Sequence, residues 1–355
     1  MTTDALAVKP YRRLGASQMA RAQLRSRALR AGICVPPEVK RDYDDLVNAQ
    51  TLEDQLARAH AAVLAVEATD LGVMLVTGGD RQTWLNGIVT CELAKLGPGA
   101  AAYGLAVTQK GRIMADLTVI VDTERLVLVV PRTEIDALKT SFEKYLIMEE
   151  AEVAAAPEAF AVWQLHGPKS IEVATRLRPL GALVAPVDYT GFGGAIVVVE
   201  RGNEASVREA MGSAIAELGG AIGEQASWES LRLACGIPRF GRDFDVTTYP
   251  QEALLEKRAV SFNKGCYLGQ EVICMLELRG HVKRKLVPLT LSAGPPPPKG
   301  ASVTDASGAV LGHVTSAAET PGGASIAFAM IKGTHAVGAE LNVAGTTARV
   351  TAPPS

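Results

Sequence analysis

The chain has 355 residues, of which 48% are hydrophobic, and a formal net charge of −2. This length and apolar content exclude a disordered chain and are sufficient for two or three domains with their own cores. The 36 Lys and Arg nearly balance the 38 Asp and Glu, so no overall basic field is present to hold nucleic acid or anionic lipid.

The cysteines and the hydropathy pattern indicate a compartment. Five cysteines, an odd number without close pairing, are typical of a reducing compartment rather than of a disulfide-stapled secreted domain. No apolar run reaches the roughly 18–20 residues of a membrane span, and residues 1–30 lack the apolar core of a secretory signal. We therefore expect a soluble, cytoplasmic protein without a membrane partner.

Residues 1–66 are predicted to form a basic, helical N-terminal extension. Seven basic residues and no acidic one lie between Lys9 and Arg30. This pattern is typical of a solvated helix face, and the alternative is an organelle-import segment that would place the protein in the mitochondrial matrix. An amphipathic stretch at Leu46–Val66 then leads into the core.

The first α+β domain is predicted over residues 67–150. Asp80 is a candidate N-cap for a short helix, and apolar side chains at helical spacing predict a longer helix at Thr133–Leu146. The strands expected in this domain are Leu71–Val76, Ala101–Val107, Ile113–Val121 and Arg125–Val130.

A similar series of elements recurs over residues 151–285 and predicts a second α+β domain, so that the body is pseudo-duplicated. Its expected elements are strands at Phe160–Leu165, Leu183–Val187 and Ala195–Glu200 and helices at Lys169–Leu177, Glu204–Leu218 and Ser227–Leu233. The prolines of Pro295–Pro298 are taken as a boundary, and short strand-like runs predict a small β-barrel over residues 286–355.

The densest chemical signal is the string Lys264-Gly265-Cys266-Tyr267-Leu268-Gly269-Gln270-Glu271. Its two glycines allow a tight turn, and a lysine that converged on the cysteine would favour the nucleophilic thiolate. The alternative is a glycine-rich turn around a buried, inert cysteine.

This string, with Arg279-Gly280 and Arg284 after it, resembles the signature of the YgfZ-type folate-binding proteins of the glycine-cleavage T-protein (aminomethyltransferase) superfamily. Further similar segments are Val76–Gly87, the hairpin around Lys110-Gly111-Arg112 and Leu231–Pro238. The resemblance is expected to span roughly Leu71 to Thr351.

The resemblance implies a body around a central cleft that receives tetrahydrofolate or a related reduced folate. It also implies a role in the assembly or repair of iron–sulfur clusters, with cluster-assembly or client proteins as partners and no bound metal. Nucleic acid is not expected as a partner, and any effect on tRNA modification would be indirect. By position, Cys266 is the catalytic thiol, Gly265 and Gly269 shape the motif backbone, and the folate-binding residues are Asp116, Lys264, Tyr267, Gln270, Glu271, Arg279 and Arg284.

Two departures from the T-protein bear on whether the protein is an enzyme. The paired aspartates of its hairpin correspond here to Ala115-Asp116, so the first carboxylate is missing. Its Y-T-G-E-x-G-x-E element reads Tyr189–Ile196 without either glutamate. These losses favour an accessory factor. A tetrahydrofolate-dependent aminomethyl transferase and a non-enzymatic interaction module that has lost folate remain as alternatives.

Overall fold

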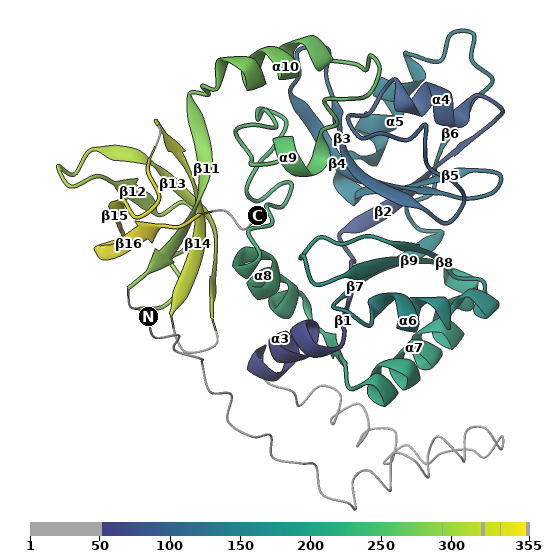
Figure 1. Ribbon diagram of the computed structural model, residues 1–355, viewed down its shortest axis with the longest axis horizontal. Coiled ribbons are helices and arrows are strands. Elements are labelled where there is room, and N and C mark those ends of the chain that lie inside the picture. The colour runs from purple at the N-terminus through teal and green to yellow at the C-terminus, as the bar shows by residue number, and fades with distance from the viewer. Residues whose placement is uncertain (1–51, 293, 321–323, 334, 353–355) are drawn as a thin grey trace, which may run out of the picture. The chain divides into compact units, whose positions relative to one another are not determined.

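The structure is a computed structural model, and it describes residues 52–292, 294–320, 324–333 and 335–352. This part of the chain contains two five-stranded sheets, with helices packed on them, and a closed barrel (Figure 1). The predicted α+β body and C-terminal barrel are therefore confirmed. The basic segment Lys9–Arg30 lies outside the described residues. Within the ranges above, no helix is long and apolar enough to cross a membrane.

The first sheet is antiparallel, in the order β3-β4-β5-β2-β6. Its strands are β2 (Leu71–Thr77), β3 (Ala101–Val107), β4 (Ile113–Val121), β5 (Leu126–Pro131) and β6 (Glu152–Ala155). The four strands predicted for this region are present. β6, which carries few apolar residues, was not predicted, and it extends the sheet beyond residue 150 by pairing with β2.

The second sheet has the order β10-β1-β7-β9-β8. Its strands are β1 (Leu64–Glu67), β7 (Phe160–His166), β8 (Leu183–Pro186), β9 (Gly194–Glu200) and β10 (Ala221–Gly223). The amphipathic stretch predicted at Leu46–Val66 is helical over its described part up to Ala61, and the prediction is wrong at its end, from Leu64. After helix α3 (Leu52–Ala61), β1 pairs with β7 and β10, because its continuous apolar run suits the buried centre of a sheet.

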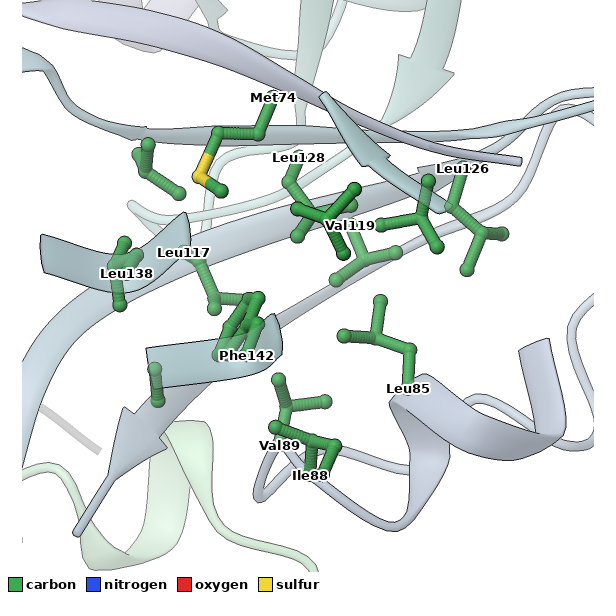
Figure 2. Close-up of a cluster of buried hydrophobic side chains, with 14 of the residues drawn as sticks. Met74, Leu85, Ile88, Val89, Leu117, Val119, Leu126, Leu128, Leu138 and Phe142 are labelled. Atoms are coloured by element: carbon green, nitrogen blue, oxygen red, sulfur yellow. The ribbon is translucent and has the colours of Figure 1, made fainter. Parts of the chain in front are cut away.

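The two sheets pack face to face, and helices cover their outer faces. Between the sheets lies an apolar layer to which Ile120 and Val129 contribute from the first sheet and Val162 and Ile196 from the second. On the outer face of the first sheet, helices α4 (Arg81–Asn86) and α5 (Ile135–Glu143) supply Leu85, Leu138 and Phe142 to a second cluster (Figure 2). Helices α6 (Ser170–Thr175) and α7 (Glu204–Leu218) cover the second sheet in the same way.

Two helix ends differ from the prediction. The carboxylate of Asp80 does not cap α4; it accepts a hydrogen bond from the Glu150 amide at 2.8 Å and so ties the helix start to the loop before β6. The predicted helix Thr133–Leu146 is shorter, because the 3₁₀ turn Arg132–Glu134 precedes α5 and the chain leaves the helix after Glu143.

The barrel has the strand order β11-β14-β13-β12-β15-β16. These strands are β11 (Arg284–Leu291), β12 (Ser302–Thr304), β13 (Val310–Glu319), β14 (Ser325–Lys332), β15 (Glu340–Val343) and β16 (Thr346–Val350). Because β11 pairs with β14 and β16, the proline run connects two barrel strands and is not a domain boundary. Between body and barrel lie helices α8 (Gln225–Ala234), α9 (Glu256–Ala259) and α10 (Gln270–Arg279).

Candidate functional site

A cleft opens where the layer between the two sheets meets helix α8. Its interior has room for about 70 Å³ of water-sized molecules, and all the space between atoms, including the open mouth, amounts to about 640 Å³. The first sheet contributes Tyr103, Asp116 and Thr118, and the second contributes Gln164. The far wall consists of Tyr189, of Gln225, Trp228 and Arg232 on α8, and of Ile237–Arg239 after it. The cleft therefore combines aromatic surface with a few polar groups, as small-molecule sites do.

Among the described residues, Asp116 is one of the two carboxyl groups that line this cleft, and the other is Asp70. The Tyr103 hydroxyl donates to its Oδ2 at 2.9 Å. Burial raises the pKa of Asp116 to about 6, and the Tyr103 hydrogen bond opposes that rise. A carboxylate has about four acceptor positions, so Asp116 can accept further hydrogen bonds from a ligand. Asp116 lines the cleft, as the folate interpretation requires.

Strand alternation separates Asp116 from its neighbour Ala115. Successive residues of a strand point to opposite faces of the sheet. Ala115 is fully buried in the cluster beneath α4 and α5, whereas Asp116 and Thr118 line the cleft. A carboxylate at position 115 would therefore point into an apolar core. The loss of that carboxylate does not remove an acid or base from the cleft, which is a correction to the argument drawn from the sequence.

The second departure concerns Ile196, which lies where the T-protein pattern has its final glutamate. Ile196 is fully buried in the layer between the sheets, and its partner across the strands is Gln164. The Gln164 side chain lines the cleft. The neutral side-chain amide of Gln164 on β7 therefore lies beside Ile196 on β9, the position at which the T-protein pattern has a glutamate.

An aromatic wall completes the cleft. The ring of His166 stacks on Trp228 with centroids 4.4 Å apart and an interplanar angle of 4°. Burial lowers the pKa of His166 to about 3, so this imidazole is neutral at physiological pH. Tyr103 and Tyr189 make an edge-to-face contact at 5.6 Å, and Thr118 hydrogen-bonds the Tyr189 hydroxyl at 2.5 Å. These contacts hold the aromatic rings in fixed positions.

Lys264 does not activate the thiol of Cys266 in this structure. Its ammonium group is buried and donates to the carbonyls of Asn86, Val89 and Cys91 at 2.6, 3.0 and 2.6 Å. All three donors of the ammonium are thus used on the segment that follows α4. The convergence of Lys264 on Cys266, considered from the sequence, is wrong, and the lysine instead fastens the motif to the first domain.

Cys266 itself is exposed in the loop before α10. Burial raises the pKa of the Cys91 thiol to about 12 and that of Cys235 to about 11, which leaves both thiols protonated and unreactive. Cys274 is partly exposed on α10, and Cys34 lies outside the described residues. Accessibility therefore distinguishes Cys266 from the buried cysteines.

The glycines of the motif have different roles. Gly269 has φ +75° and precedes the first turn of α10, and a Cβ there would lie 2.5 Å from the carbonyl oxygen of Thr108. It is therefore needed for a close approach to the β3–β4 hairpin. Gly265 has open space around it, so no contact in the structure requires a glycine there.

The remaining predicted ligands do not line the cleft with Asp116. Tyr267 is buried, and the Lys264 ammonium lies 5.3 Å from its ring centroid. Gln270 and Glu271 occupy the first turn of α10, and Arg279 is exposed at the end of this helix. Arg284 is tied to Thr247 and Glu252. Within the described ranges, the cleft lining includes no residue of Lys264–Glu271, and it includes neither Arg279 nor Arg284.

The cleft residues that were not singled out from the sequence include Tyr103, Gln164, Trp228 and Arg239. A polar Gln164 inside the otherwise apolar strand Phe160–Leu165 was the available signal, since a polar residue at a buried position needs a partner. The other three carried no signal, because only the tertiary structure brings them beside Asp116.

The fold is that of the glycine-cleavage T-protein. The chain is similar to the crystal structure of aminomethyltransferase T of the glycine cleavage system from Bartonella henselae, with a TM-score of 0.73 and 20% identity, over 85% of this chain and 89% of that one. Residues 38–180 match the GCVT N-terminal domain family, and residues 284–355 match the glycine cleavage T-protein C-terminal barrel domain family. The similarity therefore begins before Leu71, earlier than predicted.

Proteins of three kinds have similar sequences. The aminomethyltransferase of Thermotoga maritima is 25% identical over 310 residues, which cover 82% of this chain and 84% of that protein. The tRNA-modifying protein YgfZ of Vibrio vulnificus is 24% identical over 251 residues, 66% of this chain and 73% of that one. A putative chloroplastic transferase of Arabidopsis thaliana is 27% identical over 270 residues, 72% of this chain and 61% of that protein. The chain belongs to the glycine-cleavage T-protein superfamily, as a YgfZ-type member.

Proposed function

We propose that this protein binds a reduced folate in the cleft and acts, through Cys266, as an accessory factor in the assembly or repair of iron–sulfur clusters. The observation that carries the folate part is the carboxyl group of Asp116 in an aromatic cleft, with a hydrogen bond from Tyr103 and acceptor capacity left over. Similarity to an aminomethyltransferase and to YgfZ proteins supports the same proposal.

The chemistry of the cleft suits a pterin ring. A reduced pterin presents an amino group and adjacent ring N–H groups along one edge, and a carboxylate accepts such paired donors well. Gln225 also lines the cleft, and its buried Oε1 has no hydrogen-bond partner among the described residues. A buried acceptor without a partner costs free energy that a ligand donor would recover. Trp228, backed by the neutral His166, offers a flat surface for an aromatic ring.

Calorimetric titration with tetrahydrofolate tests this part directly. We expect saturable binding by the wild-type protein and at least tenfold weaker binding by Asp116→Asn, which keeps the shape but replaces one acceptor oxygen by a donor. Thr83→Ser, an exposed change on α4, is the matched control. Equal affinities of wild type and Asp116→Asn would refute the assignment of the ligand to Asp116.

Cys266 supplies the second part of the proposal. Its loop is anchored by Lys264 and by the Leu268 amide, which donates to the Gly87 carbonyl at 3.0 Å. An exposed thiol on an anchored loop is suited to contact a cluster-assembly protein or a client enzyme. Because Cys266 does not line the cleft, we propose that folate and the protein partner occupy different surfaces.

A one-carbon transferase is the second candidate function, and one observation favours it. Asp116 faces the cleft with a pKa of about 6, close to the range in which a carboxyl group can both accept and donate a proton near neutral pH. Turnover of tetrahydrofolate with an aminomethyl donor would establish this activity. The third alternative, an interaction module without folate, predicts that cluster-assembly proteins are recovered with the protein although tetrahydrofolate does not bind.

A further inference from the structure

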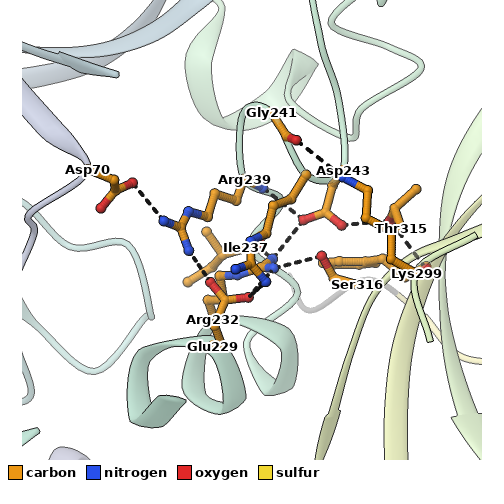
Figure 3. Close-up of polar contacts among 12 residues, drawn as sticks. Asp70, Glu229, Arg232, Ile237, Arg239, Gly241, Asp243, Lys299, Thr315 and Ser316 are labelled. Carbon is orange, nitrogen blue, oxygen red and sulfur yellow. Dashed lines mark hydrogen bonds and ion pairs between the residues drawn. The ribbon is translucent and has the colours of Figure 1, made fainter. Parts of the chain in front are cut away.

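A network of ion pairs joins Arg232, Arg239 and Arg242 to three carboxylates, those of Glu229, Asp243 and Asp70, and reaches Thr315 and Ser316 of the barrel (Figure 3). Arg232 is fully buried and pairs with Asp243 and Glu229, each at 2.7 Å, and donates to Ser316 of β13 at 2.8 Å. Arg239 pairs with Asp70 at 2.8 Å and with Glu229.

The members of this network differ in how firmly they are held. Glu229 is shared by three guanidinium groups, those of Arg232, Arg239 and Arg242, and its side chain is 15% exposed. Asp243 is fully buried and also accepts from Thr315. The Asp70 side chain is 42% exposed, and it reaches Arg239 from the turn between β1 and β2.

Charge counting shows what Asp70 does. The three arginines Arg232, Arg239 and Arg242 are balanced by Glu229, Asp243 and Asp70. Without Asp70 the ion-paired residues have one positive charge more than negative charges, and Arg239, which lines the cleft, would keep only Glu229, which it shares with Arg232 and Arg242. A guanidinium group binds any carboxylate of suitable orientation, from the protein or from a ligand. A ligand carboxylate can replace the exposed Asp70 as the partner of Arg239, whereas Glu229 and Asp243 are too enclosed for a ligand to replace them.

We propose that Arg239 binds a carboxylate of the ligand's glutamate tail, and that Asp70 is an internal carboxylate which the ligand displaces. This inference rests on the proposed function, because it assumes that the ligand is a folate. It names the ligand class more narrowly: a folate with its glutamate tail binds here in preference to a tail-less pterin derivative. The charge of the network is the same before and after the exchange.

Other arginines fit this role less well. Arg279 and Arg284, to which the sequence resemblance gave a folate role, do not line the cleft. Arg232 lines the cleft, but its two terminal nitrogens already donate to Asp243, Glu229, Ser316 and the Ile237 carbonyl, and its Nε, which has no partner among the described residues, is buried. Arg239 combines a place on the cleft wall with a partner that solvent can reach.

The test uses two ligands that differ only in the glutamate tail, and both are titrated into the full-length protein. They are tetrahydrofolate and the primary amide of tetrahydropteroate, which keeps the benzamide group of folate and has no carboxylate. We expect Arg239→Gln to weaken tetrahydrofolate binding about tenfold and binding of the amide less than twofold. Asp70→Asn removes the competing charge and should tighten tetrahydrofolate binding about threefold without changing the binding of the amide. Arg242→Gln is the matched control, since Arg242 shares Glu229 but does not line the cleft.

Each outcome decides a separate question. If the wild-type protein binds neither ligand, the proposed function itself fails. If it binds both ligands with equal affinity, or if Arg239→Gln weakens both to the same degree, folate binding stands and the role of Arg239 is refuted. If Arg239→Gln does not fold, Asp70→Asn still tests the proposal. The same tetrahydrofolate affinity in Asp70→Asn and in the wild type would refute the displacement of Asp70 by the ligand.

Discussion

Replacing Lys264 with methionine distinguishes the two roles that this lysine could have. Methionine keeps an unbranched apolar stem but removes the ammonium group, which donates to three backbone carbonyls. A hydrogen bond from a charged donor contributes about 1.5–3 kcal/mol to stability, and the sum over the three bonds is an upper bound on the stability that Lys264→Met can remove. Burial lowers the pKa of Lys264, so part of that gain is offset by the cost of removing the charge from water. We therefore expect a loss of about 2–4 kcal/mol in the free energy of unfolding.

Urea unfolding measures this loss, with Lys110→Met as the control. Lys110 is exposed at the β3–β4 turn, and its substitution should change the free energy of unfolding by no more than about 0.5 kcal/mol. The pH profile of Cys266 alkylation, recorded in variants that also lack Cys274, should be the same with and without Lys264. An unchanged urea midpoint together with an alkylation profile shifted to higher pH would refute this reasoning and restore Lys264 as the activator of the thiol.

Three further predictions concern the cleft. Tetrahydrofolate affinity should fall about tenfold per pH unit below pH 6 in the wild type, where Asp116 becomes protonated, and should be much less pH-dependent in Asp116→Asn, as titrations at several pH values would show. Folding raises the pKa of Asp116 from 3.8 to about 6, so the contribution of this group to the free energy of unfolding is lost as the pH rises from about 4 to 6. Urea unfolding at several pH values should show this decrease in the wild type and not in Asp116→Asn. The same dependence on pH in both proteins would contradict the assignment. Arg232→Met leaves Asp243 buried without its guanidinium partner and should lower the free energy of unfolding by about 3–5 kcal/mol. Arg242 is exposed, and Arg242→Met should lower the free energy of unfolding by less than about 1 kcal/mol. Similar losses in the two variants would show that the buried network contributes little.

The sequence predicted the strands of the body well where apolar runs were long. β3 and β4 lie at the predicted residues, because each combines a run of apolar side chains with a turn at Lys110-Gly111. β1 was missed because its residues were taken as the end of the amphipathic stretch Leu46–Val66, and β6 was missed because it carries few apolar residues. The proline run was misread as a boundary, because the pairing of β11 with β14 depends on contacts about 40 residues away.

The site was predicted in part, and the reason lies in tertiary contacts. Asp116 was recognised by its place in a hairpin similar to that of the T-protein, and it does line the cleft. The role of Ala115 was misjudged because a paired motif in a sequence does not say which side chain faces a ligand, whereas the register of β4 does. The pairing of Arg239 with Asp70, about 170 residues apart in the chain, could not be predicted from local pattern.

The central claim is that folate binding in the cleft and the thiol of Cys266 serve one function, and complementation tests it most directly. A strain lacking this protein would be supplied with the wild type, Cys266→Ala, Asp116→Asn or the control Cys274→Ala, and the activity of an enzyme with a four-iron cluster would be measured at matched protein levels. We expect the wild type and Cys274→Ala to restore activity and the other two variants to fail. Restoration by Cys266→Ala as complete as that by the wild type would contradict the account.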